Sequence, residues 1–429
     1  MKIAIVADDL TGASDCGGQL VRYGIRVSVQ INPVMAEESN YDAVVFNTVS
    51  RSLPANEAAL IVKQVSQYIN EQPFDLIYKK IDSTLRGNIG AELNAMSDVI
   101  QPDFMIIAPG YPQNGRQIIE RIHHLNGELL HETEVSRDPK TPVLQSDVVE
   151  LVASQTGRAV AHLSKADIDR GKAHLADRLE VYKVQNMTYI VADSIIEEDL
   201  ERLANALAQL PYKYVWVGSA GLMNHLPKAF AIAENDKPQH IPLPVRNDPV
   251  LLVVGSVSKM GREQLHSLMN QELAVQIMAR SEKLLADEAG KQLELDRVID
   301  AASRALATGR HTVIVASDNV AETKAVGQLL GMTPIQISDA ISAALGSITV
   351  KLFGGLAIHK LFLTGGDTAY QVLEQLGITA FELMEELEPG VLLGKYEARS
   401  LYIVTKAGNF GSDQTMERVI KKLHGGECI

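Results

Sequence analysis

The chain opens on the stretch IAIVADDLTGA, residues 3–13, in which an apolar run ends on two acidic residues just before a helical pattern begins. The run shows no strict alternation of apolar and polar residues, which is typical of a parallel strand buried under helices on both faces. Asp8 and Asp9 therefore stand beyond the carboxyl end of a predicted strand, where open α/β sheets bind their ligands. Helix capping by Asp9 or Thr11 is the structural alternative.

Similar apolar runs recur in both halves of the chain. They cover residues 43–46, 76–79, 104–108, 189–191, 214–217, 250–254, 275–278, 312–315, 361–363 and 401–404. Helical patterns follow them, which predicts two α/β domains with mainly parallel sheets. Between the two series, residues 236–249 hold prolines at 238, 242, 244 and 249 and few residues able to pack. We therefore expect a domain over 1–235, a linker over 236–249 and a second domain over 250–429.

Composition narrows the class of protein. The 429 residues carry a formal net charge of −13, which argues against a general nucleic-acid binder because such proteins neutralise phosphates with Lys and Arg. Two cysteines exclude a disulfide framework. The N-terminal apolar run is too short for a signal peptide, and no uninterrupted apolar stretch nears the roughly 18 residues of a membrane span. We expect a soluble cytoplasmic protein with no membrane partner, and a homo-oligomer is left open.

A polar segment follows the predicted strand at 76–79. It reads KKIDSTLRGN, residues 79–88, and combines two cations, a carboxylate, two hydroxyls and a guanidinium. An arginine fork can grip a carboxylate with two parallel bonds and lysine adds a point charge, so this segment suits an anionic, hydroxylated small molecule. Arg51, after the strand at 43–46, is a candidate second guanidinium. An exposed charged turn is the structural alternative.

Three junctions in the second half are rich in glycine and hydroxyl groups. They are Gly255-Ser256-Val257-Ser258, Thr364-Gly365-Gly366-Asp367-Thr368 and residues 406–412, KAGNFGS. Glycine lets a ligand approach the backbone, and a following helix attracts phosphate oxygens with its first N–H groups. Asp367 is a candidate for Mg²⁺ or phosphate orientation. Walker A and G-x-G-x-x-G spacings are absent from the sequence.

An anion-and-hydroxyl site in one domain and a phosphate site in the other predict a kinase, with the active site in the interdomain cleft. Five runs also carry a resemblance: residues 7–13, 80–87, 255–258, 364–368 and 406–411 are similar to the signature of the four-carbon acid sugar kinases. The resemblance implies an N-terminal acid-sugar-binding domain, a C-terminal ATP-binding domain, and ATP-dependent phosphorylation of the C4 hydroxyl of a tetronate.

The candidate residues combine the local reading with this resemblance. Substrate binding is assigned to Asp9, Arg51, Lys80, Asp82, Ser83, Thr84, Leu85 and Arg86. ATP binding is assigned to Ser256, Ser258, Gly365, Gly366, Asp367, Thr368 and Gly408. On chemistry, Asp9 ranks first as hydroxyl ligand or base, Asp82 follows, and Asp367 is reserved for Mg²⁺ or phosphate. No Mg²⁺ ligand set is assigned.

The segment at 132–143, ETEVSRDPKTPV, resembles the D-threonate kinase branch more than the 3-oxo-tetronate kinase branch. D-threonate is therefore the expected substrate, with 3-oxo-tetronate and D-erythronate as alternatives. Two rival classes stay open. One is a phosphatase of the haloacid dehalogenase type, although its D-x-D spacing differs from two adjacent aspartates. The other is a non-catalytic sensor of an acid sugar or a nucleotide.

Overall fold

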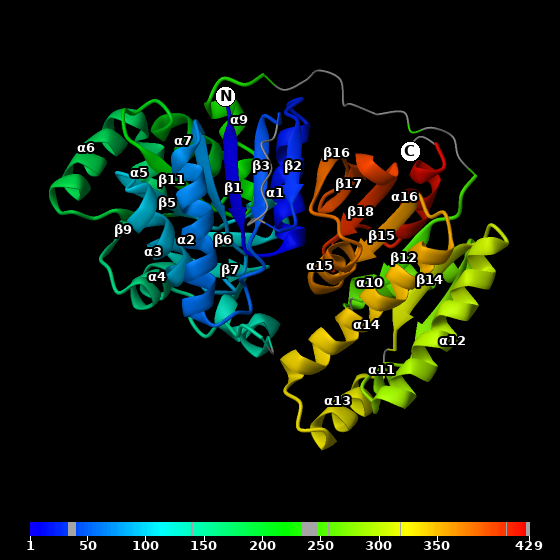
Figure 1. The fold of residues 1–429 in the computed structure, drawn as a ribbon. Coiled ribbons are helices and arrows are strands. Elements are labelled where there is room, and N and C mark those ends of the chain that lie inside the picture. Colours follow the sequence, from blue (N-terminus) through cyan, green and yellow to red (C-terminus); the bar gives the residue numbers. More distant parts are fainter. Residues whose placement is uncertain are drawn as a thin grey trace. The chain divides into compact units, whose positions relative to one another are not determined.

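The structure, a computed structural model, describes residues 1–32, 40–138, 140–233, 243, 247–255, 258–317, 319–408 and 410–425. The chain divides into two compact units, Met1–Pro238 and Gln239–Ile429 (Figure 1). Most of the expected linker, residues 236–249, lies outside the described residues, so that linker stays a prediction.

The N-terminal unit is built on a parallel sheet in the order β2-β3-β1-β4-β11-β5-β10-β9. Its strands are β1 (Ile3–Ala7), β2 (Val27–Gln30), β3 (Ala43–Asn47), β4 (Leu76–Lys80), β5 (Phe104–Ala108), β9 (Val160–Leu163), β10 (Tyr189–Ala192) and β11 (Tyr214–Gly218). Its helices are α1 (Leu10–Val21), α2 (Ala55–Glu71), α3 (Ile89–Ile100), α4 (Val148–Thr156), α5 (Lys165–Asp169), α6 (Gly171–Val184), α7 (Glu197–Leu207), α8 (Ala220–Met223) and α9 (Leu226–Ala229).

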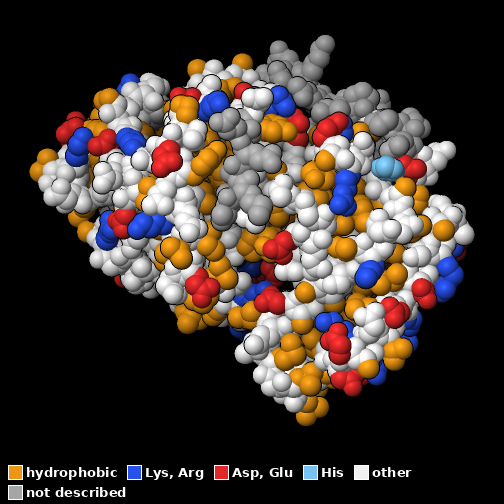
Figure 2. Space-filling model, viewed as in Figure 1, with side chains coloured by type: hydrophobic (Ala, Val, Ile, Leu, Met, Phe, Trp, Pro, Cys, Tyr) orange, Lys and Arg blue, Asp and Glu red, His pale blue; other side chains and the backbone are white. Residues whose placement is uncertain are grey.

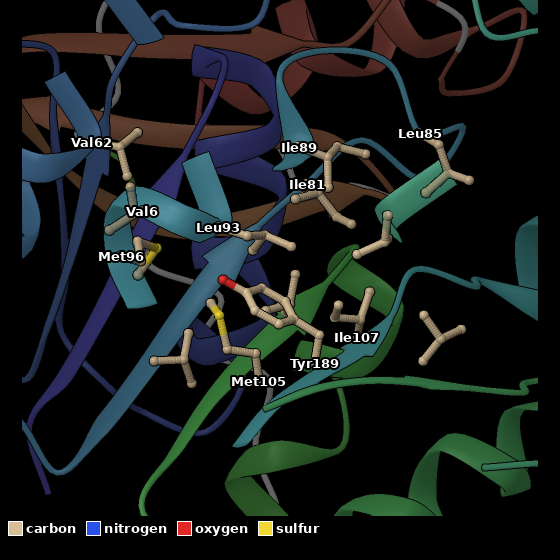
Figure 3. Packing of buried hydrophobic residues seen from close by; sticks show 14 of the residues in the cluster. Val6, Val62, Ile81, Leu85, Ile89, Leu93, Met96, Met105, Ile107 and Tyr189 are labelled. Atoms are coloured by element: carbon tan, nitrogen blue, oxygen red, sulfur yellow. The ribbon is translucent and has the colours of Figure 1, made fainter. Parts of the chain in front are cut away.

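Helices cover both faces of this sheet, which explains why its strands read as continuous apolar runs. On one face, Val6 of β1 packs with Val62 of α2 and with Leu93 and Met96 of α3 in a single apolar cluster (Figure 3). Ile3, Ile5 and Ala7 alternate with Ala4 and Val6 and are also buried, because side chains along a strand point to opposite faces.

A small antiparallel sheet interrupts the N-terminal unit between β5 and α4. It consists of β6 (Arg116–Ile119), β7 (Ile122–Leu125) and β8 (Glu128–Leu129), followed by the 3₁₀ turns Leu130–Glu132 and Glu134–Arg137. The sequence reading did not anticipate this insert, nor β2 and β9. Each of these strands is only two to four residues long, too short for a pattern to stand out.

The C-terminal unit has strands in the order β13-β14-β12-β15-β18-β17-β16. They are β12 (Leu251–Val254), β13 (Ala274–Ala279), β14 (His311–Ala316), β15 (Lys360–Thr364), β16 (Ala380–Glu388), β17 (Val391–Tyr396) and β18 (Leu401–Lys406). Its helices are α10 (Lys259–Asn270), α11 (Ser281–Leu284), α12 (Glu288–Ala307), α13 (Val320–Leu329), α14 (Pro334–Gly355), α15 (Gly366–Gln375) and α16 (Thr415–Leu423). The first five strands in this order pair parallel with their neighbours, and β17 pairs antiparallel with both β18 and β16. This confirms two α/β domains with mainly parallel sheets.

One described helix, α14, is long and apolar enough to cross a membrane by length and composition, with a mean hydropathy of 1.2 in its most apolar window. In the structure 44% of that window is buried, and α14 packs on α12 and α15. A core helix of a globular domain passes the same test, so this helix is weak support for a membrane span.

One face of the molecule carries charges of both signs (Figure 2). On the face shown in Figure 2, blue Lys and Arg side chains alternate with red Asp and Glu side chains rather than gathering in one sheet of like charge.

Candidate active site

The polar segments after β1, β3 and β4 meet at the carboxyl edge of the N-terminal sheet. These three strands are neighbours, and Ala7 is in register with both Asn47 and Lys80. The residues that follow each strand therefore emerge side by side, as parallel pairing requires. Adjacent strands bring together Asp8, Arg51 and Asp82, which are far apart in the sequence.

Arg51 holds both N-terminal aspartates. Its Nε donates to Asp8 Oδ2 at 2.8 Å, and its Nη2 donates to Asp8 Oδ1 at 2.9 Å and to Asp9 Oδ1 at 2.6 Å. Burial would raise the pKa of Asp8, but the charges of Arg51, Lys79 and Lys80 hold it below its usual value. Two neighbouring carboxylates are thus tolerated because one guanidinium binds both.

Asp9 has two roles in the structure. As N-cap of α1 it accepts the Gly12 backbone N–H at 3.0 Å, and its other oxygen accepts the Thr11 hydroxyl at 2.7 Å. Its side chain is still 18% exposed, whereas that of Asp8 is 4% exposed. Asp9 can therefore cap α1 and still be open to a ligand, and its carboxylate is more accessible than that of Asp8.

Gly12 is needed at this turn. A Cβ there would lie 2.4 Å from Asp9 Oδ1 and 3.0 Å from Lys80 Nζ. The Lys80 ammonium is buried and donates to the Ile81 carbonyl at 2.9 Å. Only glycine lets the helix start approach both charged groups.

The segment after β4 folds around Asp82. Arg86 donates to it through Nε at 2.7 Å and Nη2 at 3.2 Å, and the Thr84 hydroxyl donates to the same carboxylate. Burial would raise the pKa of Asp82, but Arg86 and Arg51 hold it well below its usual value. Leu85 adopts a left-handed φ of 61° and its side chain lies in the apolar core, so only its backbone can reach a ligand.

Arg86 also reaches the insert between β5 and α4. Its Nη1 donates to Asp138 Oδ2 at 3.1 Å, and Asp138 Oδ1 accepts the backbone N–H groups of Lys140 and Thr141 at 2.9 Å each. Asp138 lies within residues 132–143, the segment that suggested the D-threonate branch. The structure thus connects that segment to the predicted substrate loop.

His123, on β7, supports the same loop. Its Nε2 lies 2.7 Å from the Ser83 carbonyl oxygen, so the neutral ring must carry its proton on Nε2 to donate. The side chain is fully buried, and burial lowers the pKa of His123 to about 4. No sequence signal marks this contact, because it joins residues 40 positions apart.

This burial predicts a pH dependence of folding. Below its ordinary value of 6.5 the unfolded state protonates His123, while the folded state resists until about pH 4, so stability falls as the pH drops through this window. We expect a loss of about 3 kcal/mol from this group. Urea unfolding at pH 7 and pH 4.5, followed by the fluorescence of Trp216, measures it, because this single tryptophan is buried in β11.

His123→Gln is the matched variant, since an amide keeps a donor for the Ser83 carbonyl but does not titrate. Its unfolding free energy should fall less steeply with acidification. An identical slope in both proteins would contradict the assignment.

A buried ion pair holds the Arg51 segment in place. Lys79 Nζ lies 2.7 Å from Glu92 Oε2, and Glu92 Oε1 accepts the Ser50 hydroxyl at 2.6 Å. Asn88 Nδ2 donates to the carbonyl oxygens of Ser50 and Leu53 at 2.9 and 2.8 Å. Glu92 lies in the first turn of α3, and the sequence gave no sign of its role because Lys79 and Ser50 are 13 and 42 positions away.

In the C-terminal unit, the loops after β12, β15 and β18 adjoin at the carboxyl edge of the sheet. Gly255 N–H donates to the Thr364 carbonyl at 3.1 Å, and Gly365 N–H donates to the Lys406 carbonyl at 3.2 Å. A Cβ on Gly255 would lie 1.8 Å from Thr368 Oγ1, so this glycine is required for the two loops to touch.

The residues assigned to ATP surround these loops. Ser258 caps α10 through Gly261 N–H at 3.1 Å and donates its hydroxyl to the Gly408 carbonyl at 2.7 Å. Asp367 is exposed in the first turn of α15, and Thr368 beside it is buried. Ser256 lies outside the described residues. The helix start at Gly366 offers backbone N–H groups suited to an anion.

Two residues outside the ATP-binding assignment shape the loop after β18: Lys406, which opens the run at 406–412, and Gln264, which the sequence analysis did not single out. The buried ammonium of Lys406 donates to the carbonyls of Ala407, Gly408 and Phe410 at 3.0, 3.0 and 3.1 Å. Gln264 of α10 donates to the carbonyls of Phe410 and Ser412 at 3.0 and 2.8 Å. Burial lowers the pKa of Lys406 to about 8. These contacts fix the loop that carries Gly408.

Within the described ranges, no three His, Cys, Asp or Glu side chains gather as a metal site. Mg²⁺ in nucleotide sites is commonly bound by one or two carboxylates together with the phosphates, so the single carboxylate of Asp367 suits that pattern.

Family models match both parts of the chain. A sugar-binding N-terminal domain matches residues 3–226, and a nucleotide-binding C-terminal domain matches residues 251–416. A D-threonate kinase from Salmonella typhimurium is 34% identical over 423 residues, covering 97% of each chain. A 3-oxo-tetronate kinase from Haemophilus influenzae is 28% identical over 421 residues, covering 97% of this chain and 98% of the relative.

A solved structure from Salmonella typhimurium aligns with a TM-score of 0.81 and 24% identity over 96% of this chain and 97% of that chain, which shows a shared fold. The two matching domains and the relatives named as kinases agree with the resemblance carried by the five sequence runs. The chain belongs to the four-carbon acid sugar kinase family.

Proposed function

We propose that this protein is an ATP-dependent kinase that phosphorylates the C4 hydroxyl of a four-carbon acid sugar, with D-threonate as the substrate. The observation that carries this proposal is the cluster of Asp9, Arg51 and Arg86 at the carboxyl edge of the domain that matches a sugar-binding model. The 34% identity to a D-threonate kinase supports the choice of substrate, as does the contact between Arg86 and Asp138.

The reaction assigns a role to each charged group. Asp9 accepts the proton of the C4 hydroxyl while the hydroxyl oxygen bonds to the γ-phosphorus and the bond from that phosphorus to the β–γ bridging oxygen breaks. Arg86, Arg51 and Lys80 neutralise the acid-sugar carboxylate. Asp82 ranks behind Asp9 as the base because its side chain is less exposed, 12% against 18%, and because Arg86 and Arg51 hold its pKa well below its usual value, which makes it a weak proton acceptor. It positions Arg86, and the Ser83–Leu85 backbone completes the loop.

For the nucleotide, we propose that Ser256, Ser258, Gly408 and the Gly365–Thr368 turn bind the phosphates. Asp367 would hold Mg²⁺, which when bound neutralises charge on the phosphates. We further propose that the two domains present their ligands to one another across an interdomain cleft. Because ATP is a cytoplasmic cosubstrate, a cytoplasmic location follows from this activity.

An ADP-release assay over D-threonate, L-threonate, D- and L-erythronate and the 3-oxo-tetronates tests the proposal. We expect the highest kcat/KM with D-threonate. The highest value with 3-oxo-tetronate or D-erythronate, the substrates after which other relatives are named, would reassign the substrate but keep the reaction. If no acid sugar stimulates ADP release while one still binds, the protein is a sensor.

Arg86→Ala is expected to raise KM for the acid sugar by about 10–100-fold, because a charge-assisted bond to an anion is lost. KM for ATP should change less than about twofold, since Arg86 belongs to the sugar-binding unit. The KM of Arg86→Lys for the acid sugar should lie between those of the parent protein and Arg86→Ala, because lysine keeps the positive charge but not the planar guanidinium fork.

Arg158→Ala is the matched control for this series. It removes an arginine that is also paired with an aspartate, Asp98, but on the surface of the same unit. Equal losses of sugar and ATP affinity in Arg86→Ala would contradict the division of binding between the domains.

A further inference from the structure

Arg116 ends the loop that follows β5 and begins β6. This loop reads PGYPQNGR, residues 109–116, and closes where Tyr111 N–H donates to the Arg116 carbonyl at 2.8 Å and Arg116 N–H donates to the Tyr111 carbonyl at 3.1 Å. Gly115 adopts a left-handed φ of 74°, and a Cβ there would lie 2.1 Å from Asn126 Oδ1. Glycine at this position therefore lets the loop turn into β6 and fixes the backbone of Arg116.

The register of the small antiparallel sheet directs Arg116 toward the segment after β4. Arg116 lies opposite Leu125, and Ile118 lies opposite His123. Residues two apart along a strand, and residues directly opposite in a strand pair, point to the same face. Arg116 therefore shares a face with His123, and this face is turned toward the substrate loop because His123 donates to the Ser83 carbonyl.

The half-buried guanidinium of Arg116 has donors that the protein does not use. Its Nη1 donates to the Asn114 carbonyl, but its Nε is buried and donates to no described residue. No carboxylate of the described residues lies within ion-pair distance of it, whereas Arg51 and Arg86 are each bound to two aspartates. A buried donor without an acceptor is costly, so an anionic ligand would complete this group.

The charges around Arg116 leave it short of an anion. Burial lowers the pKa of Arg116, the charges of Asp82 and Glu134 oppose this shift, and the charge of Arg86 adds to it. Because the pKa is lowered overall, the two acidic neighbours do not offset the burial. Arg116 thus lies within reach of the charges of Asp82 and Arg86 but forms no ion pair of its own with the described residues.

We propose that Arg116 binds the carboxylate of the acid sugar, with Nε and Nη2 donating to its two oxygens. A guanidinium binds a carboxylate through two parallel bonds, and Nε with Nη2 is the pair of donors that Asn114 leaves open. Arg51, Lys80 and Arg86 then supply further positive charge. Holding the carboxylate end in this way leaves the C4 end of the substrate for Asp9. This inference rests on the proposed function of the unit as the acid-sugar-binding domain.

Arg116→Met tests the assignment, because methionine keeps an apolar stem but no donor and no charge. We expect Kd for D-threonate, measured by calorimetry without ATP, to rise about 10–100-fold, since charge-assisted bonds are lost. Kd for ADP should stay unchanged. The urea midpoint of the ligand-free protein, followed by Trp216 fluorescence, should not fall, because the variant removes a buried donor that has no partner. A merely structural arginine would lower that midpoint.

Neutral and stereoisomeric ligands separate the carboxylate from the hydroxyl groups. L-threonate and D-erythronate share the carboxylate, so their Kd should rise by the same factor as that of D-threonate. D-threitol has no carboxylate and should bind Arg116→Met as it binds the parent protein. Arg121→Met is the matched control, since Arg121 lies in the same insert but is paired with Asp147 at 2.8 Å and is 46% exposed. It should leave Kd for D-threonate unchanged.

A rise in Kd for D-threonate of less than roughly twofold in Arg116→Met would overturn the inference. An equal weakening of D-threitol would also overturn it, because the contact would then not be to the carboxylate. Binding is measured without ATP, so these results do not depend on turnover. If the parent protein binds a tetronate but does not phosphorylate it, the proposed reaction is wrong while the role of Arg116 in binding stands.

Discussion

Asp9→Asn is expected to lower kcat by about 10²–10⁴-fold while the protein stays folded. The amide cannot accept the proton of a hydroxyl, but asparagine is as good an N-cap as aspartate, so the bond from Gly12 N–H and the start of α1 should survive. The substitution therefore separates the two roles that the structure gives Asp9. Steady-state kinetics with ATP and D-threonate measure the loss, and Trp216 fluorescence checks the fold.

Asp98→Asn is the matched control, because Asp98 also pairs with an arginine but is exposed at the surface of the same unit. It should leave kcat unchanged. If Asp9→Asn retained kcat within a few-fold, Asp9 would be neither the base nor a ligand of the reacting hydroxyl. A rise in KM alone would make it a binding residue.

Arg51→Ala is expected to destabilise the N-terminal unit by about 3–5 kcal/mol, because it leaves the Asp8 carboxylate buried without its main cation. Activity should fall as well, since Asp9 loses the same partner. The midpoint of urea unfolding followed by Trp216 fluorescence measures the effect in this unit alone, because the tryptophan lies in β11.

The pH dependence of that loss identifies its cause. In the parent protein Arg51 keeps the pKa of Asp8 below its ordinary 3.8, so the stability from this pair is present above pH 3.8 and is lost as the pH falls further. In Arg51→Ala the main cation that opposes the effect of burial is gone, so the pKa of Asp8 rises. Protonation of Asp8 then removes the unpaired buried charge that destabilises the variant. The difference in unfolding free energy between the parent protein and Arg51→Ala should therefore become smaller below about pH 4.

Arg51→Ala combined with Asp8→Asn provides the control. Removing the buried charge together with its partner should recover part of the lost stability, as expected for an unpaired ion. A double variant no more stable than Arg51→Ala would show that lost packing, not the unpaired charge, causes the destabilisation.

The parallel strands could be predicted because their burial is encoded locally. The run at 104–108 is apolar throughout, since both faces of β5 are covered. In contrast, β16 alternates buried with half-buried residues and carries several glutamates, so a search for continuous apolar runs passes over it. Strand β16 was missed for this reason.

Candidate binding residues that directly follow strands could also be read from the sequence. Asp9, Arg51 and Arg86 each lie within six residues of a strand end, where ligands of open sheets bind. His123, Glu92 and Gln264 could not be read in this way. They act on backbone groups or side chains of other segments, and such partners are chosen by packing.

By itself, the sequence determined the α/β class and the strand ends at which charged and glycine-rich segments gather. Short-range patterns suffice for this, because periodicity and strand ends depend on neighbours within a few residues. Tertiary structure alone decided that Arg51 binds Asp8 and Asp9 together, that His123 supports Ser83, and that Arg116 lies beside the segment after β4. These features depend on strand order and on which side chains meet across elements, and contacts of that range leave no local pattern in a single sequence.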